Sequence, residues 1–191
     1  MTSTCITYAD ILKPSGRISS IVYDSMLILA GSILIALSAK IAFPIPFSPV
    51  PVTGQTFAVL LTGALLGSRR GVLAVLAYMA EGISGMPVFT GAGAGFAYLM
   101  GPTGGYVAGF AAAAGITGLL AEKGWDRNIF TTALAMAAAS AAIYLFGVMW
   151  LSIYAGSKAI SLGLIPFIPG DIIKIALAAI ILPAGWKLIR R

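Results

Sequence analysis

Apolar residues occur along this chain in long runs, separated by short segments rich in proline, glycine or charge. The runs extend over residues 21–43, 53–67, 71–83, 104–121, 129–154 and 170–188. A helix of about 20 mostly apolar residues is long enough to cross the hydrocarbon core of a bilayer. The pattern therefore predicts an all-α membrane protein with six transmembrane helices. They would form a single integral membrane domain, residues 1–191, whose residues 1–20 are a cytoplasmic tail.

Two intervening segments have unusual composition. The first, Pro44–Pro51, has four prolines in eight positions and cannot continue a helix. The second, residues 85–106, is apolar but too rich in glycine for a stable helix. Irregular backbone at membrane depth survives only inside protein or beside water. We therefore expect residues 85–106 to fold back over the helices as a lid, next to a ligand cavity of the kind found in transporters.

Composition supports the membrane assignment and argues against an enzyme. Hydrophobic residues make up 59% of the chain and charged residues 9%, and the mean hydropathy is +0.99. Soluble domains carry roughly 25% charged residues. The sequence has no histidine, which excludes histidine-ligated metal sites and Ser-His-Asp triads, and it lacks the glycine-rich phosphate loop of ATPases. We expect a transport protein without a cofactor, driven by energy from elsewhere.

The distribution of basic residues predicts the orientation of the chain. Its net charge is +6, but lysine and arginine lie at the ends of the apolar runs, which indicates membrane topology and not nucleic-acid binding. Nine of the 12 basic residues fall on one side of a six-helix arrangement. The positive-inside rule then places both termini in the cytoplasm of a multi-pass plasma-membrane protein. The proline- and glycine-rich loops would meet on the outer face.

The candidate ligand-binding pair is Asp171 and Lys174, at the outer end of the last run. Three residues apart, they share one helical face. An ionised residue deep in a bilayer costs about 2.5–3.5 kcal/mol and usually faces the interior. The alternative is that Asp171 caps the helix and Lys174 extends to the lipid headgroups. The apolar segment 164–169 favours a buried, functional pair.

Other polar residues have two readings each. Gln55 could contact a ligand or tie down the proline segment. Tyr98 could stack on a ligand or belong to an interfacial aromatic belt. Lys40 and Glu81 are expected at the outer boundary of the membrane, outside the site. Asp24 is expected to cap the first helix or to pair with Arg17.

Several motifs in order along the chain resemble the BioY family, the biotin-specific substrate-binding (S) components of energy-coupling factor (ECF) transporters. The motifs are Pro49-Val50-Pro51-Val52-Thr53-x-Gln55-Thr56, Gly85-x-Pro87-Val88-Phe89, Gly101-Pro102-Thr103-Gly104-Gly105-Tyr106 and Pro166-Phe167-x-Pro169-Gly170-Asp171-x-x-Lys174. The resemblance extends from about position 20 to the last helix. It implies an ECF S-component-like fold of six helices with a glycine- and proline-rich outer lid, and a biotin pocket near the outer face. That pocket would be closed by the first and third outer loops, residues 44–51 and 156–169.

The resemblance also implies residue roles. Asp171 and Lys174 would be the polar anchors of biotin, with further contacts from Gln55 and from the loop between Gly93 and Tyr98. The chain departs from the family's usual pattern in carrying Gly54, where a bulky aliphatic residue is common, and in lacking a polar side chain near Gly93.

Partners follow from the same resemblance: biotin, the lipid bilayer, and an ECF module with a transmembrane coupling subunit and two ATPases. Docking on that module would use small residues of the first helix, here Ser32, Ala36 and Ala39. Two alternatives remain open, namely an S component for another vitamin and a small structural or channel-like membrane protein.

Overall fold

The computed structural model describes residues 7–189, which are largely helical, as the sequence predicts. The helices are α1 (Tyr8–Ile11), α2 (Arg17–Ser38), α3 (Gln55–Leu66), α4 (Ser68–Ile83), α5 (Phe96–Leu99), α6 (Gly104–Glu122), α7 (Ile129–Ala155), α8 (Ala159–Gly163) and α9 (Ile168–Ile189). Four short 3-10 turns are η1 (Thr90–Ala92), η2 (Trp125–Arg127), η3 (Gly156–Lys158) and η4 (Ile165–Phe167). The strands β1 (Ala42–Phe43) and β2 (Val52–Thr53) form an antiparallel pair. Cys5, Arg190 and Arg191 lie outside the described residues.

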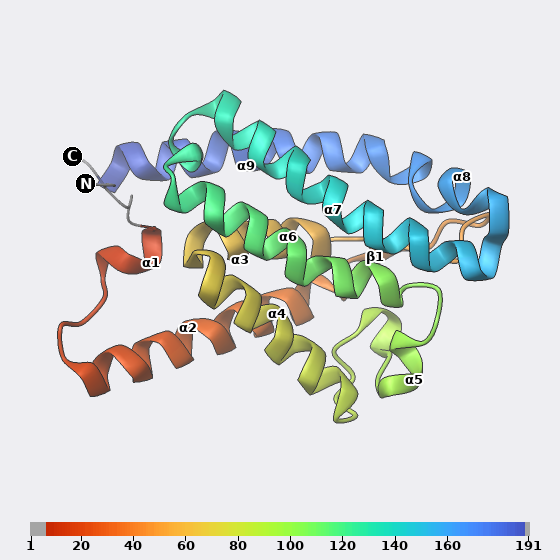
Figure 1. The fold of residues 1–191 in the computed structure, drawn as a ribbon, viewed down its shortest axis with the longest axis horizontal. Helices are drawn as coiled ribbons and strands as arrows, with labels where there is room; N and C mark the ends of the chain where they lie inside the picture. The colour runs from red at the N-terminus through yellow and green to blue at the C-terminus, as the bar shows by residue number, and fades with distance from the viewer. Residues whose placement is uncertain (1–6, 190–191) are drawn as a thin grey trace.

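The long helices run between two chemically different ends of the molecule. Both chain termini lie at one end, and α5 and α8 lie at the other (Figure 1). Helices α6, α7 and α9 run lengthwise, while α2 leans away beside α4 (Figure 1). The arrangement gathers the glycine-rich lid and the α7–α9 connection at the end away from the termini.

Three helical stretches within residues 7–189 are long and apolar enough to cross a membrane. They are Arg17–Ser38, Gly104–Glu122 and the almost continuous stretch Ile129–Ile189, which contains α7, α8 and α9. Helix α3 is apolar but shorter. Helix length and composition thus support a membrane protein, and the count of six membrane crossings stays a prediction.

Helix α6 occupies the centre of the bundle, and glycines let its neighbours approach closely. A Cβ atom on Gly63 of α3 would lie 2.2 Å from Oγ1 of Thr117 on α6. A Cβ on Gly105 of α6 would lie 2.2 Å from Cβ of Trp150 on α7. Small residues at such contacts are the usual means of packing helices in lipid. They hold α3, α6 and α7 together around the cavity described below.

The ends of two helices are fixed by local hydrogen bonds. Helix α4 begins directly after Gly67, whose φ of 86° favours glycine. The Glu122 carboxylate caps it, accepting hydrogen bonds from the Ser68 backbone N (2.7 Å) and hydroxyl (2.8 Å). The basic residues Arg69 and Arg70 therefore lie inside α4 instead of ending the preceding run. Asn128 caps α7 by accepting from the Phe130 backbone N at 2.8 Å.

The small residues expected to dock on a coupling subunit are largely buried within this chain. Ser32 and Ala39 are fully buried, and Ala36 is only partly exposed. The Ser32 hydroxyl donates to Glu81 of α4 at 2.6 Å. These small residues pack α2 against the rest of the chain, so they do not present a free surface to another subunit.

Candidate ligand-binding site

A small cavity lies between the first turns of α3, α6 and α9, the second half of α4 and the middle of α7, on the side away from the termini. Its volume is about 40 Å³, and its polar lining includes Gln55, Thr56, Tyr144, Asp171 and Lys174. The aromatic residues of its wall are Tyr78, Tyr98, Tyr106, Phe110 and Phe167. Aromatic walls around a few convergent polar groups are typical of small-molecule sites.

The pair at the start of α9 is buried, as the functional reading of the sequence expects. Asp171 is 7% exposed, and its Oδ1 lies 3.2 Å from Lys174 Nζ. Lys174 Nζ also donates to the Thr53 carbonyl oxygen at 3.0 Å and to Thr56 Oγ1 at 2.7 Å. An ammonium group has three protons, so each has a partner. Lys174 thus joins α9 to the start of α3 instead of extending to the headgroups.

Tyr144 of α7 is a site residue that the sequence does not reveal. Its hydroxyl donates a short hydrogen bond to Asp171 Oδ2. A carboxylate offers about four lone-pair positions, and Tyr144 and Lys174 together use two. Asp171 therefore keeps acceptor capacity for a ligand. Tyr144 lies within a long apolar helix, where a tyrosine has the pattern of any interfacial aromatic residue.

Gln55 is the first residue of α3 and connects three parts of the site. Its side-chain Nε2 donates to the Tyr78 hydroxyl at 2.5 Å, and its Oε1 accepts from Thr90 at 2.9 Å and more weakly from Thr53 at 3.4 Å. Gln55 is 4% exposed. The structure thus places Gln55 in the cavity wall and shows that it ties the lid, through Thr90, to α3.

Tyr98 lines the cavity, whereas Gly93 lies behind it. The Tyr98 ring stacks on Phe89 with centroids 4.7 Å apart, and Phe89 meets Tyr78 edge to face at 5.4 Å. A Cβ atom on Gly93 would lie 2.3 Å from the Tyr98 ring. Of the five candidate residues, four line the cavity; Gly93 instead leaves room for the aromatic ring that does.

The lid is fastened at several points by side chains outside it. Lys40 Nζ donates to the Pro87 carbonyl oxygen at 2.5 Å, and Trp150 Nε1 donates to that of Gly101 at 2.9 Å. The Tyr154 hydroxyl makes a short bond to the Met100 carbonyl oxygen. Neither Lys40 nor Glu81 lines the cavity, in agreement with the expectation that both lie outside the site.

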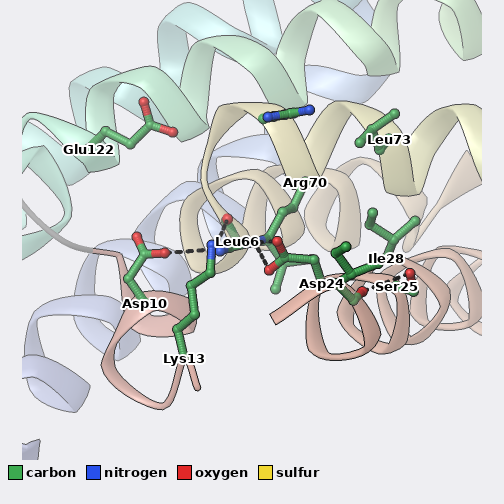
Figure 2. Close-up of a pocket in the computed structure, with 11 residues that line it drawn as sticks. Asp10, Lys13, Asp24, Ser25, Ile28, Leu66, Arg70, Leu73 and Glu122 are labelled. Carbon is green, nitrogen blue, oxygen red and sulfur yellow. Dashed lines mark hydrogen bonds and ion pairs between the residues drawn. The ribbon is translucent and has the colours of Figure 1, made fainter. Parts of the chain in front are cut away.

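A second, larger cavity of about 570 Å³ lies near the termini, and four of its charged residues pair with one another: Asp10, Lys13, Asp24 and Arg70. Arg70 is placed between two carboxylates, with 2.8 Å contacts to Asp10 and to Asp24 (Figure 2). Asp24 also lies 3.5 Å from Lys13, which corrects the expectation that it pairs with Arg17. Because these charges neutralise each other, we assign this cavity a structural role.

Comparison with known proteins agrees with the geometry. The model of the BioY family matches residues 11–191. The "Biotin transporter BioY" of Thermotoga maritima is 44% identical over 140 residues, covering 72% of this chain and 81% of the relative. A "Probable biotin transporter BioY" of Pyrococcus horikoshii is 42% identical over 149 residues, covering 78% and 86%.

A solved structure shows the same fold. It is the crystal structure of the S-component for biotin from an ECF-type ABC transporter, with a TM-score of 0.79 and 27% sequence identity. The alignment covers 91% of this chain and 95% of that one. The fold, the family model and the relatives agree, and this chain belongs to the BioY family.

Proposed function

We propose that this protein binds biotin from outside the cell and acts as the substrate-specificity component of an ECF-type uptake transporter. The observation that carries the proposal is the ion pair of buried Asp171 and half-buried Lys174, which lines an aromatic cavity at the end away from the termini. Membership of a family whose relatives are named biotin transporters supports it. The energy for uptake would come from a separate coupling subunit and two ATPases.

The chemistry of the pair suits the ureido ring of biotin, which has two N–H donors and one carbonyl acceptor. Asp171 has lone pairs left to accept from the ring nitrogens. Lys174 would donate to the ring carbonyl by exchanging one of its present bonds, to Thr53 or Thr56. The aromatic wall would enclose the apolar part of the ring system.

Binding requires the cavity to open and expand. A volume of about 40 Å³ holds about three water molecules, far less than a bicyclic vitamin. Thr90, which donates to Gln55, and Tyr98 belong to the lid and line the cavity, so we expect these contacts to shift when it expands. We therefore expect slower association than for a preformed open pocket.

The direct test is calorimetric titration of the purified protein with biotin, without ATP. Saturable binding is expected; no heat and no saturation would reject the proposal. Saturable binding of thiamin or riboflavin that biotin does not displace would instead indicate an S component for another vitamin.

The first prediction concerns Asp171→Asn. The variant keeps the size of the side chain but loses the negative charge and half of its acceptor capacity, so biotin affinity should fall at least tenfold, about 1.4 kcal/mol. Glu81→Gln is the matched control, because Glu81 bonds Ser32 outside the cavity and its loss of charge should leave affinity unchanged. Wild-type affinity in Asp171→Asn would remove Asp171 from the site.

Partnership with the coupling subunit is tested by co-purification in mild detergent followed by mass spectrometry. The burial of Ser32 and Ala39 means that docking through them would require α2 to separate from α4. Ser32→Leu should thus impair folding of the isolated chain, and not only assembly.

A further inference from the structure

A third cavity lies directly outside the candidate site and continues it. Its volume is about 560 Å³, and it lies between the proline segment 44–51 and the lid residues 90–103. It shares Pro51, Thr90, Tyr98 and Thr103 with the inner cavity. The shared residues form a neck, so a ligand that reached the inner cavity would extend through it into the outer one.

The two cavities differ sharply in charge. The inner one contains Asp171 and Lys174. In the part of the chain that the structure describes, every residue lining the outer cavity is proline, glycine, alanine, threonine or tyrosine. Lys40 lies two positions before the lining residue Ala42, but its ammonium group donates to the Pro87 carbonyl oxygen at 2.5 Å. Lys174 has all three of its protons bonded within the inner cavity.

We infer that the site recognises the ring of biotin but not the charge of its carboxylate tail, so that it accepts carboxyl-amidated biotin as well as the free acid. This rests on the proposed function. With the ureido ring held by Asp171, the tail would extend through the neck into the outer cavity. There the tail would contact hydroxyl groups, backbone and water, which can form hydrogen bonds with an amide as well as with a carboxylate.

The physical reason is the absence of a cation from the outer lining combined with its open volume. A buried charge contributes to specificity when an opposite charge is fixed beside it. A carboxylate that stays in contact with water gains little from the protein and loses little on amidation. The 560 Å³ outer cavity also leaves room for the added group. The ligand class is therefore biotin linked to an amine, including biotin joined to the side chain of lysine.

The test is competition by biotin amide and biotinyl-lysine against labelled biotin on the purified full chain. Dissociation constants within about threefold of that of biotin are expected. A biotin methylated on a ureido nitrogen should bind at least tenfold more weakly, because it loses a donor to Asp171. Lys40→Gln should leave the ratio of the affinities for the acid and the amide unchanged, because its ammonium group bonds the lid backbone and not the tail.

The results that overturn the inference differ from those that overturn the proposed function. If biotin binds but its amide binds more than tenfold more weakly, the protein reads the tail charge and the inference fails alone. Equal affinities for the acid and the amide in Lys40→Gln would then show that Lys40 binds the carboxylate. Equal affinities in Lys174→Gln would show that the carboxylate, and not the ureido ring, lies beside Lys174. If neither compound binds, the proposed function fails and this inference with it.

Discussion

The hydrogen bond from Tyr144 fixes the orientation of the Asp171 carboxylate. Asp171 lies on the first turn of α9, where rotation of its side chain would let it turn away from the cavity. The bond from α7 and the contact with Lys174 hold both oxygens in place. A site whose main acceptor is oriented before binding loses less conformational entropy when the ligand arrives.

Gly93 tests whether the lid ring contributes to affinity. In Gly93→Ala the new Cβ would lie 2.3 Å from Tyr98, so the ring must move. We expect biotin affinity to fall by about three- to tenfold with no polar contact removed. Gly170→Ala is the control, because its Cβ clears the nearest atom by 3.9 Å next to the same site. Equal affinities in the two variants would exclude Tyr98 from the binding surface.

Asp126 is a buried carboxylate outside the site and gives a pH prediction. It is 2% exposed and accepts from Trp186 Nε1 at 2.5 Å, and its Oδ1 has no hydrogen-bond partner among residues 7–189. Burial raises the pKa of Asp126 above its usual 3.8, although the Trp186 bond and the Arg127 charge act in the opposite direction. Because the pKa of Asp126 is raised in the folded protein, the stabilising contribution of its carboxyl group is complete below about pH 4. That contribution declines as the pH rises through the pKa of the folded protein.

Asp126→Asn should therefore raise the melting temperature in detergent at pH 7 and flatten its dependence on pH above 4. The amide oxygen still accepts from Trp186, while the cost of a buried charge disappears. Trp186→Phe is the contrasting variant: it removes the donor and should lower stability by about 1–3 kcal/mol. An Asp126→Asn variant less stable than wild type at pH 7 would show that the ionised carboxylate is stabilising.

At the residue scale, the sequence identifies the charged residues of the cavity and two neutral ones, Gln55 and Tyr98, but it does not identify Tyr144 or Tyr78. Asp171 and Lys174 stand out because ionised residues are rare in apolar runs. Tyr144 and Tyr78 do not, since tyrosine is common at membrane interfaces and nothing local distinguishes a residue that turns inward. The placement of Gly93 depends on the Tyr98 ring beside it, a contact that spacing alone does not reveal.

Among the elements, the short helix α1 is attached to the bundle by polar contacts. The Tyr8 hydroxyl makes a short bond to the Leu182 carbonyl oxygen of α9, and Asp10 pairs with Arg70 of α4. Arg70 is also paired with Asp24 of α2, and its side chain is only 11% exposed. One guanidinium therefore joins three helices near the termini (Figure 2).

Arg70→Gln should loosen this end of the molecule. We expect a melting temperature lower by about 3–6 °C in detergent, with Arg69→Gln as a control that shares the charge change but lies exposed. Burial acts to raise the pKa of Asp10, but hydrogen bonds from Arg70 and Thr7 outweigh it and lower it below 3.8. The stabilisation from the Arg70–Asp10 pair is thus present above about pH 4 and is lost as the pH falls through the pKa of Asp10 in the folded protein. The melting temperatures of the wild type and of Arg70→Gln should therefore converge in acid. Parallel profiles down to pH 3 would contradict this.

The element boundaries were largely predictable, and the differences have local causes. Apolar runs mark α6 and α7 to within one residue of each end. Helix α2 begins at Arg17, four residues earlier than its apolar run, because charged residues at a membrane surface do not stop a helix. The segment 156–169, whose Gly156, Pro166 and Pro169 are typical of a loop, is instead helical over much of its length. The strand pair β1–β2 has no alternating pattern long enough to predict it.

On the scale of the whole molecule, charge is divided between the two ends. The end near the termini carries interlocked ion pairs, while the opposite end carries the uncharged outer cavity and the lid. The end that carries these ion pairs is also the end at which most basic residues gather, the one predicted to face the cytoplasm. The solved S-component structure aligns with 91% of this chain and therefore includes both ends of the fold.

Thiol labelling in intact cells tests the orientation. Cys5 is the only cysteine of the chain, so a membrane-impermeant maleimide should label it only after the cells are permeabilised. In a Cys5→Ser background, Ser161→Cys on the exposed surface of α8 should react without permeabilisation. Labelling of Cys5 in intact cells would place the N-terminus outside.

The hydrogen bonds that outside side chains donate to the lid and to the α7–α9 connection share one feature: the acceptor is a main-chain oxygen. Lys40, Trp150 and Tyr154 all donate to main-chain carbonyl oxygens of the lid, and Ser48 and Tyr106 do the same to those of Leu162 and Gly163. Every residue type supplies such an oxygen. A substitution in one of these covering segments therefore leaves its carbonyl acceptor in place, whereas a substitution of a donor side chain removes the hydrogen bond. The side chains of the covering segments can therefore differ while the hydrogen bonds that hold these segments against the helices remain.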